Sequence, residues 1–189
     1  MKLLFRPRTE DLWSAGRLKY MADAVLNAGA VRILDVGSAQ VENVYLARPN
    51  LQLFCIDDWE VPPKKIAAEF RRVNVDVEGL PFESEFFDAV LAGEILEHLW
   101  SPFAFLAETN RVLRPGGMLV ISTPHPHYYL EVLKTILGIN RVDCDGHVNL
   151  FSRSHLSEVL RKLGFEVVEV KSTCMWFPLV RIVLIVVRP

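Results

Sequence analysis

The chain has 189 residues, a usual length for one domain with a substantial core. Its 21 lysines and arginines against 23 aspartates and glutamates give a formal net charge of -2. The chain has no excess of positive charge that would attract a nucleic-acid backbone, so no nucleic-acid partner is predicted. Cys55, Cys144 and Cys174 follow no paired or metal-like spacing, which favours reduced thiols and a cytoplasmic location. We expect one domain over residues 1–189, without a membrane span or secretion signal.

The first half of the chain predicts one long helix and then strands alternating with helices. Apolar residues recur at helical spacing between Thr9 and Gly29, which predicts an amphipathic helix in an N-terminal extension over residues 1–30. A strand, a short helix, a strand, a helix and a strand are then predicted, in that order, at residues 31–36, 41–48, 51–56, 64–72 and 73–77.

The second half continues this alternation and then departs from it. The predicted order is strand, helix, strand, helix, helix, strand and strand, at residues 87–92, 102–113, 118–123, 128–137, 154–163, 165–172 and 180–187. Pro115, Gly116 and Gly117 are expected to end the helix that precedes them. Because the last two strands have no helix between them, they are predicted to be antiparallel neighbours. The pattern predicts an α/β, Rossmann-like, doubly wound sheet of seven strands, mostly parallel with an antiparallel last strand.

Four acidic residues stand at or just past the ends of predicted strands, namely Asp35, Asp57, Asp76 and Glu94. Ligands of open α/β sheets bind outside the carboxyl ends of the strands, so these acids are expected to line one rim. A carboxylate about 20 residues past the first strand suits the hydroxyls of a ribose, and Asp57 occupies that position. The turn D-V-G-S-A-Q carries an acid and one glycine, which suits a cationic ligand better than the pyrophosphate of a dinucleotide.

Together these segments resemble the class I S-adenosylmethionine-dependent methyltransferases, in particular the small ones that act on metabolites, lipids or sugars. The resemblance runs from Val31 to the end and is most specific in F-D-A-V-L-A-G-E-I-L-E-H-L-W-S-P and E-T-N-R-V-L-R-P-G-G-M-L-V-I-S-T-P. It implies an enzyme that uses S-adenosylmethionine to methylate a small-molecule acceptor. Two alternatives are open: a catalytically inactive binding or regulatory protein with the same fold, and an NAD-dependent oxidoreductase, for which no nicotinamide partner is found.

The resemblance implies a set of cofactor-binding residues on this rim: Asp35, Gly37, Ser38, Ala39, Asp57, Asp58, Asp76, Val77 and Glu94. Asp35 and Gly37 would hold the methionyl part and Asp57 the ribose. Asp76 with Val77 would face the adenine edge. Each of Asp57, Asp76 and Glu94 is also compatible with a plain solvated acid at a strand end, and for Asp58 a solvated neighbour of Asp57 is the favoured interpretation.

The loop after the first strand departs from the family pattern D-x-G-x-G-x-G. Ala39 and Val41 stand in place of the second and third glycines. Glycine serves such turns through positive φ and close approach of the backbone, and a β-branched valine provides neither. A reshaped loop that still binds and a loop that has lost its ligand are both open.

The resemblance also implies catalytic roles for two histidines. His98 occupies the family's E-H-L position and could take a proton from an acceptor, while His147 would close the acceptor pocket in a substrate-side insertion over residues 125–152. A helix-capping role for His98 is equally open. Another set, His125, His127, Cys144 and His147, lacks the usual spacing of zinc ligands, so no metal is predicted.

Overall fold

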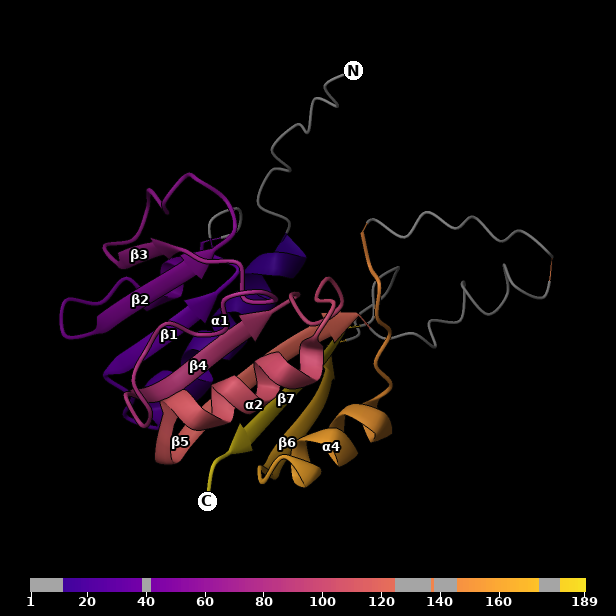
Figure 1. The fold of residues 1–189 in the computed structure, drawn as a ribbon. Helices are drawn as coiled ribbons and strands as arrows, with labels where there is room; N and C mark the ends of the chain where they lie inside the picture. Colours follow the sequence, from indigo (N-terminus) through magenta and orange to yellow (C-terminus); the bar gives the residue numbers. More distant parts are fainter. Residues whose placement is uncertain (1–11, 39–41, 125–136, 138–145, 174–180) are drawn as a thin grey trace.

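The computed structural model describes residues 12–38, 42–124, 137, 146–173 and 181–189. Its strands form one mixed sheet in the order β3-β2-β1-β4-β5-β7-β6 (Figure 1). Their bounds are β1 Arg32–Val36, β2 Gln52–Asp57, β3 Glu69–Arg72, β4 Phe87–Gly93, β5 Leu113–Pro124, β6 Glu166–Thr173 and β7 Arg181–Val187. Strands β1 to β5 pair in parallel, and β7 runs antiparallel to both β5 and β6. The predicted Rossmann-like sheet and the antiparallel pairing of its last two strands are confirmed.

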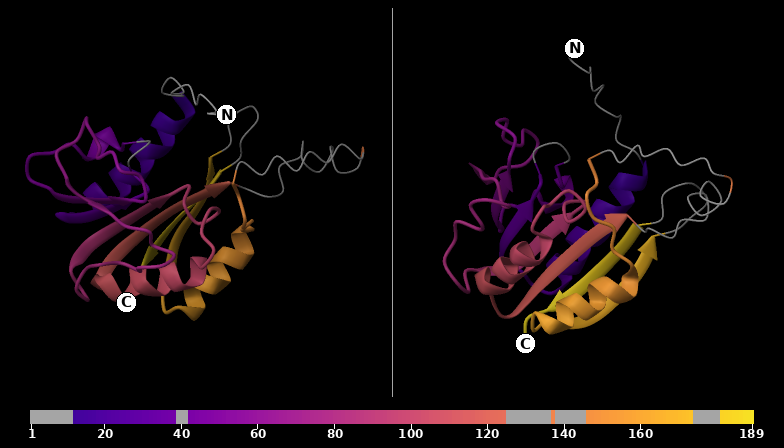
Figure 2. Two further views of the ribbon diagram at one scale, coloured as in Figure 1. Left: turned by 45° about the horizontal axis from the view of Figure 1, so that its top comes forward. Right: turned by 45° about the vertical axis from the view of Figure 1, so that its right-hand side comes forward.

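Helices cover both faces of this sheet (Figures 1 and 2). Helix α1, Leu12–Asn27, lies on one face, and α2, Pro102–Val112, lies with α4, Arg153–Lys162, on the other. In β1, Ile33 belongs to the buried cluster formed with α1, whereas Leu34 belongs to the cluster formed with α2 and α4. A central strand that packs against helices on both faces needs apolar residues on both faces. The apolar run V-R-I-L-D-V predicted such a strand for β1. Among the described residues, no helix is long and apolar enough to cross a bilayer.

The connections of the β1–β3 half differ from the prediction. The predicted helix over residues 41–48 is reduced, in its described part, to the 3-10 turn η1, Val44–Leu46. The predicted helix at 64–72 is absent, because its last residues form β3 instead. The predicted strand at 73–77 is a turn, in which the Asn74 side chain accepts a hydrogen bond from the Asp76 amide at 3.1 Å. Asparagine favours such local hydrogen bonds over a strand ladder.

Helix α2 ends at Val112, one residue before the predicted end, but Pro115, Gly116 and Gly117 lie within β5 and are not the stop of the helix. Leu113 already has extended φ and ψ angles of -75° and 137°, so β5 begins there and contains the glycines. The Gly116 amide donates to the Arg188 carbonyl at 2.7 Å, and the Arg188 amide donates to the Gly117 carbonyl at 2.9 Å. A Cβ at Gly117 would lie 2.7 Å from the Arg114 carbonyl oxygen. The glycines therefore join β5 to the chain that leaves β7.

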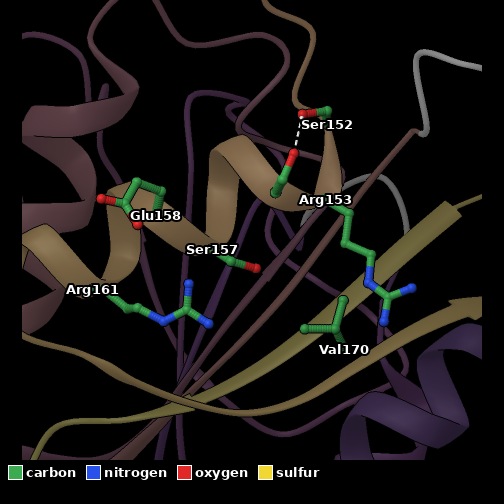
Figure 3. A pocket seen from close by; sticks show the side chains of 7 residues that line it. Ser152, Arg153, Ser157, Glu158, Arg161 and Val170 are labelled. Carbon is green, nitrogen blue, oxygen red and sulfur yellow. Dashed lines mark hydrogen bonds between the residues drawn. The ribbon is translucent and has the colours of Figure 1, made fainter.

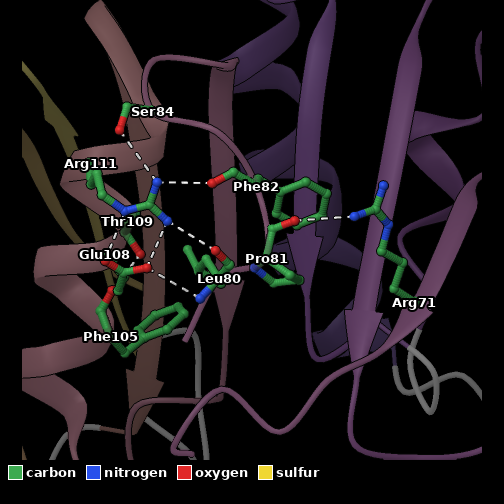
Figure 4. Close-up of polar contacts among 9 residues, drawn as sticks. All are labelled: Arg71, Leu80, Pro81, Phe82, Ser84, Phe105, Glu108, Thr109 and Arg111. Atoms are coloured by element: carbon green, nitrogen blue, oxygen red, sulfur yellow. Dashed lines mark hydrogen bonds and ion pairs between the residues drawn. The ribbon is translucent and has the colours of Figure 1, made fainter. Parts of the chain in front are cut away.

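Arg111 of α2 holds the loop that precedes β4 (Figure 4). Its guanidinium donates to the carbonyls of Leu80 and Phe82, both at 2.9 Å, and pairs with Glu108 at 2.7 Å. Arginine suits this position because its planar fork can donate to several acceptors at once. This contact fixes the loop E-G-L-P-F against α2.

Candidate functional site

The carboxyl ends of β1, β2, β4 and β5 meet at one edge of the sheet, and most of the predicted residues lie there. Asp35 stands beside Cys55 of β2 and Leu91 of β4 in the sheet register. Asp57 is the last residue of β2, and Glu94 directly follows β4. The rim predicted from strand ends is therefore present.

Asp35 is an unusual carboxyl because it is only 7% exposed. Burial raises its pKa to about 7, with a further increase from Asp57, while the nearby Arg17 opposes the increase. The chain turns just after it: Gly37 has φ +78°, and a Cβ there would lie 3.3 Å from Ile95 Cδ1. A buried carboxylate is costly unless it is paired, so this acid would favour a positively charged group beside it.

The side chain of Arg17 of α1 contacts residues at this edge, which the sequence analysis missed. Its side chain is 6% exposed, and Nη1 donates to the Ser122 hydroxyl at 2.7 Å and lies 3.7 Å from Glu94 Oε1. The Ser122 hydroxyl in turn donates to Glu94 at 2.9 Å. A sequence signal was available, because Arg17 precedes Met21 by one helical turn and so falls on the apolar face of α1.

Glu94 has a left-handed backbone with φ +57°, which is uncommon for a residue other than glycine. Its amide donates to the Ser122 carbonyl at 2.9 Å, so the turn after β4 is fixed to the end of β5. Strained backbone of this kind persists where the surroundings hold it, and it concentrates at functional sites. The carboxylate is directed by this turn onto Ser122 and Arg17.

The two histidines that the sequence predicted to be catalytic lie together, although they are far apart in the chain. The ring centroids of His98 and His147 are 4.7 Å apart. Glu97 joins them, since one potential ligand atom from each of the three residues lies within 4.8 Å of the others. Glu97, which the sequence analysis did not select, is 1% exposed and accepts a hydrogen bond from Thr123 at 3.2 Å. Burial raises its pKa to about 8, assisted by the charge of Glu94.

Backbone contacts hold these histidines in place. The amides of Val148 and Asn149 donate to the Glu97 carbonyl at 2.8 and 3.1 Å. The Asn149 side chain donates to the carbonyls of Leu96 and Leu99. The segment 146–149 is therefore fastened to the turn 94–99, and His147 is brought to His98 by hydrogen bonds between loops.

Of the remaining predicted residues, Asp76 is engaged in backbone hydrogen bonds, while Val77 and Asp58 are exposed. Both carboxylate oxygens of Asp76 accept backbone hydrogen bonds at the start of α2, from Trp100 at 3.0 Å and from Ser101 at 2.8 Å. Val77 is 82% exposed, and Asp58 is exposed beside Asp57. The predicted residues that lie outside the described part of the chain are Ala39, Val41, His125, His127, Cys144 and most of the insertion over 125–152.

A solvent-open cavity of about 850 Å³ lies elsewhere, between α4 and β6 (Figure 3). Its lining residues are Ser152, Arg153, Ser154, Ser157, Glu158, Arg161 and Val170. None of the predicted site residues belongs to it. The chemistry of the rim, rather than this cavity, therefore defines the candidate site.

A family model described as a methyltransferase domain matches residues 8–170 of the chain. The chain belongs to this methyltransferase family. A probable S-adenosylmethionine-dependent methyltransferase of Mycolicibacterium smegmatis is 30% identical over 59% of the chain and 42% of its own length. A malonyl-[acyl-carrier protein] O-methyltransferase of Laribacter hongkongensis is 32% identical over 79% of the chain and 55% of its own length. The chain thus spans about half the length of these curated relatives.

Solved structures share the methyltransferase fold. The [4+2]-cyclase SpnF covers 98% of the chain and 86% of its own length, with a TM-score of 0.75 at 20% identity. The 1,6-didemethyltoxoflavin-N1-methyltransferase of Burkholderia thailandensis, solved with S-adenosylhomocysteine, covers 94% of the chain and 81% of its own, with a TM-score of 0.68 at 19% identity. S-adenosylmethionine is the cofactor of the methyltransferase family to which the chain belongs.

The rim residues fit this cofactor. The buried, high-pKa carboxyl of Asp35 lacks a full counter-charge, and the ammonium of a methionyl group would supply one. At Gly37, the left-handed turn places backbone without a side chain on this rim, and a Cβ there would instead lie against Ile95. Asp57, half-buried at the end of β2, offers carboxylate oxygens at the position where a ribose is expected.

Proposed function

We propose that this methyltransferase-family protein transfers a methyl group from S-adenosylmethionine to a small-molecule acceptor, with lipid- and sugar-linked compounds included in that class. The observation that carries the proposal is the juxtaposition on one rim of a buried acid, Asp35, with the paired histidines His98 and His147. The acid suits a cationic cofactor, and the histidines suit an acceptor that must lose a proton. The free, buried Cys55 accords with a cytoplasmic location.

The cofactor side of the site works by binding and orientation. Asp35 would pair with the ammonium group, Asp57 would accept from the ribose hydroxyls, and the Gly37 turn would let the ligand approach the backbone. When bound, S-adenosylmethionine supplies a sulfonium methyl, which forms a bond to the acceptor's lone pair while its bond to sulfur breaks and leaves the electron pair on sulfur. Fixing the two reactants in line can supply much of the rate acceleration for such a displacement.

The acceptor side is formed by His98 and His147, which would orient the nucleophile and receive the proton that it loses. Oxygen is the acceptor atom that we favour among oxygen, nitrogen and carbon. The support is that several relatives carry names of O-methyltransferases, among them a ubiquinone biosynthesis O-methyltransferase of Cereibacter sphaeroides that is 31% identical over 49% of the chain and 41% of its own length.

Calorimetric titration with S-adenosylhomocysteine tests this proposal, and two neighbouring acids provide a matched pair. Replacing Asp57 with Ala should weaken binding by about 1–3 kcal/mol, because charge-assisted hydrogen bonds to the ribose are lost. Replacing the exposed Asp58 with Ala should leave affinity nearly unchanged. No binding by the unaltered protein at millimolar ligand would contradict the proposal. Binding without methyl transfer to any acceptor class would favour the alternative of an inactive binding or regulatory protein.

A further inference from the structure

Glu97, His98 and His147 form a compact group of potential metal ligands, called the Glu-His-His cluster below. One ligand atom from each lies within 4.8 Å of the others. Two imidazoles and a carboxylate are a ligand set that divalent transition metals accept, with bonds of about 2.0–2.2 Å. Ligand atoms in such a shell lie roughly 3.3 Å apart for tetrahedral bond angles. Small side-chain rotations would therefore close the cluster around an ion.

The Glu97 carboxylate provides a second, independent indication of a ligand. Its side chain is 1% exposed, and Oε2 accepts from the Thr123 hydroxyl at 3.2 Å. For Oε1, no hydrogen-bond partner exists within the described part of the chain. A buried carboxylate oxygen without a partner is costly, so such atoms usually face a ligand, an ion or a water molecule.

The two histidines are also held as metal ligands commonly are. His98 Nδ1 lies 3.3 Å from the Gly146 carbonyl oxygen. A proton on Nδ1 that donates to this carbonyl leaves the lone pair of Nε2 available to a metal, which is the usual arrangement around metal-binding imidazoles. Gly146 directly precedes His147, so the contact that orients one histidine also positions the other.

We propose that the Glu-His-His cluster binds one divalent transition-metal ion of the Zn²⁺ type and leaves at least one coordination position open for the acceptor. This inference rests on the proposed function and narrows it to an oxygen acceptor, namely a hydroxyl compound with a neighbouring oxygen that can chelate a metal. In this narrower form of the proposal, the imidazoles of His98 and His147 would hold the ion instead of receiving the acceptor's proton. The ion would draw electron density from the hydroxyl and lower its pKa, so that its proton leaves to water and the oxygen lone pair becomes available to the methyl group. The sequence analysis predicted no metal from the set His125, His127, Cys144 and His147, of which only His147 belongs to this cluster.

The experiment uses the full chain, free of any affinity tag, stripped with a chelator and then titrated with Co²⁺ alone. We expect one Co²⁺ per chain, a visible absorption band from the bound ion, and displacement by Zn²⁺. His147→Ala and Glu97→Gln should each weaken Co²⁺ binding by roughly tenfold or more, as loss of a ligand or its support does. His155→Ala is the matched control, because this exposed histidine on α4 lies outside the cluster.

S-adenosylhomocysteine titration of the same samples separates the two proposals. Retained cofactor binding in Glu97→Gln and His147→Ala shows that the variants are folded and that the loss concerns the metal. Absence of Co²⁺ binding by the unaltered protein, or binding that neither variant weakens, would overturn the metal site while cofactor binding persists. Absence of S-adenosylhomocysteine binding by the unaltered protein would instead overturn the proposed function.

Discussion

The acids that we propose bind the cofactor are held by strands, whereas the histidines that we propose contact the acceptor are held by two loops; these are called the cofactor side and the acceptor side below. Asp35 lies within β1, and Asp57 ends β2. His98 and His147, by contrast, are joined through hydrogen bonds from the segment 146–149 to the Glu97 carbonyl. Central strands are fixed by ladders on both sides, while loops depend on a few contacts.

This difference suggests that separate parts of the methyltransferase fold serve cofactor binding and acceptor binding. A side made of strand ends offers a constant shape to a cofactor that does not vary. A side made of fastened loops can change its residues without disturbing the sheet, so it suits an acceptor that differs among relatives. The contacts that connect the two sides are the places where this distinction can be tested.

The largest loss of stability is expected on replacing Arg17, which contacts the ends of both β4 and β5 through Glu94 and Ser122. Arg17→Ala should lower the free energy of unfolding by about 2–4 kcal/mol, because it removes a buried cation from the Ser122 hydroxyl and the Glu94 carboxylate. Lys19→Ala on the same helix is the control, since Lys19 and Asp23 form an exposed pair that should contribute at most about 0.5 kcal/mol. Urea unfolding measures both. Equal effects of the two variants would show that Arg17 is not a structural anchor.

Asp76 tests whether an acid assigned to the cofactor instead supports a loop. Asp76→Ala should lower unfolding stability by about 1–2 kcal/mol, because the amides of Trp100 and Ser101 at the start of α2 lose their acceptor. Asp76→Asn keeps one acceptor oxygen, so its stability should lie between those of the unaltered protein and Asp76→Ala. Thermal or urea unfolding and S-adenosylhomocysteine titration distinguish support of the loop from contact with the cofactor. Unchanged stability with weakened binding would assign Asp76 to the adenine.

The pH dependence of cofactor binding reports on Asp35. Its folded pKa of about 7 means that the carboxyl is mostly protonated at pH 6 and mostly ionised at pH 8. The ionised form attracts an ammonium, so S-adenosylhomocysteine should bind up to about tenfold more tightly at pH 8 than at pH 6. Asp35→Asn should bind more weakly at pH 8 and lose this dependence. An identical pH profile in the variant would place the ammonium elsewhere.

Gly37 should give the smallest difference in stability between a variant and its control. Here the turn after β1 lies close to Ile95 of the turn 94–99. Gly37→Ala and Gly29→Ala both place alanine at a positive φ, which costs about 1 kcal/mol or more in each case. Only Gly37 has a neighbour, Ile95, close to the added Cβ. Gly37→Ala should therefore lose up to about 1 kcal/mol more stability than Gly29→Ala, and it alone should weaken S-adenosylhomocysteine binding. Equal losses of stability and of S-adenosylhomocysteine affinity in Gly37→Ala and Gly29→Ala would show that the contact of Gly37 with Ile95 does not matter.

The sequence predicted most of this fold, and its errors have a common physical origin. Strands buried on both faces and the helices α1, α2 and α4 were located, since burial and periodicity leave strong signals. Strand β3 was missed because an edge strand with Arg71 and Arg72 facing solvent carries little apolar pattern. Val73 and Val75 alternate like a strand, but the Asn74 side chain turns the backbone there.

The same reasoning explains what was found and missed in the site. Acids at strand ends follow from topology, so the places of Asp35, Asp57 and Glu94 on the rim could be predicted from the sequence. His98 and His147 came from resemblance, and only the tertiary fold shows them in contact. Glu97 and Arg17 were missed because burial of a charged side chain depends on partners that are distant in sequence.

The position of β7 also governs when the protein can assemble during synthesis. Strand β7 is made after the other six strands of the described sheet but lies between β5 and β6, and in that sheet β6 is joined to the other strands only through it. Until the ribosome has released residues 181–187, the apolar edge of β5 lacks its partner and β6 has none. From the synthesis of β5 to that of β7, the nascent chain therefore carries an unpaired, aggregation-prone strand edge, and chaperone protection of that edge would matter more than early formation of α1.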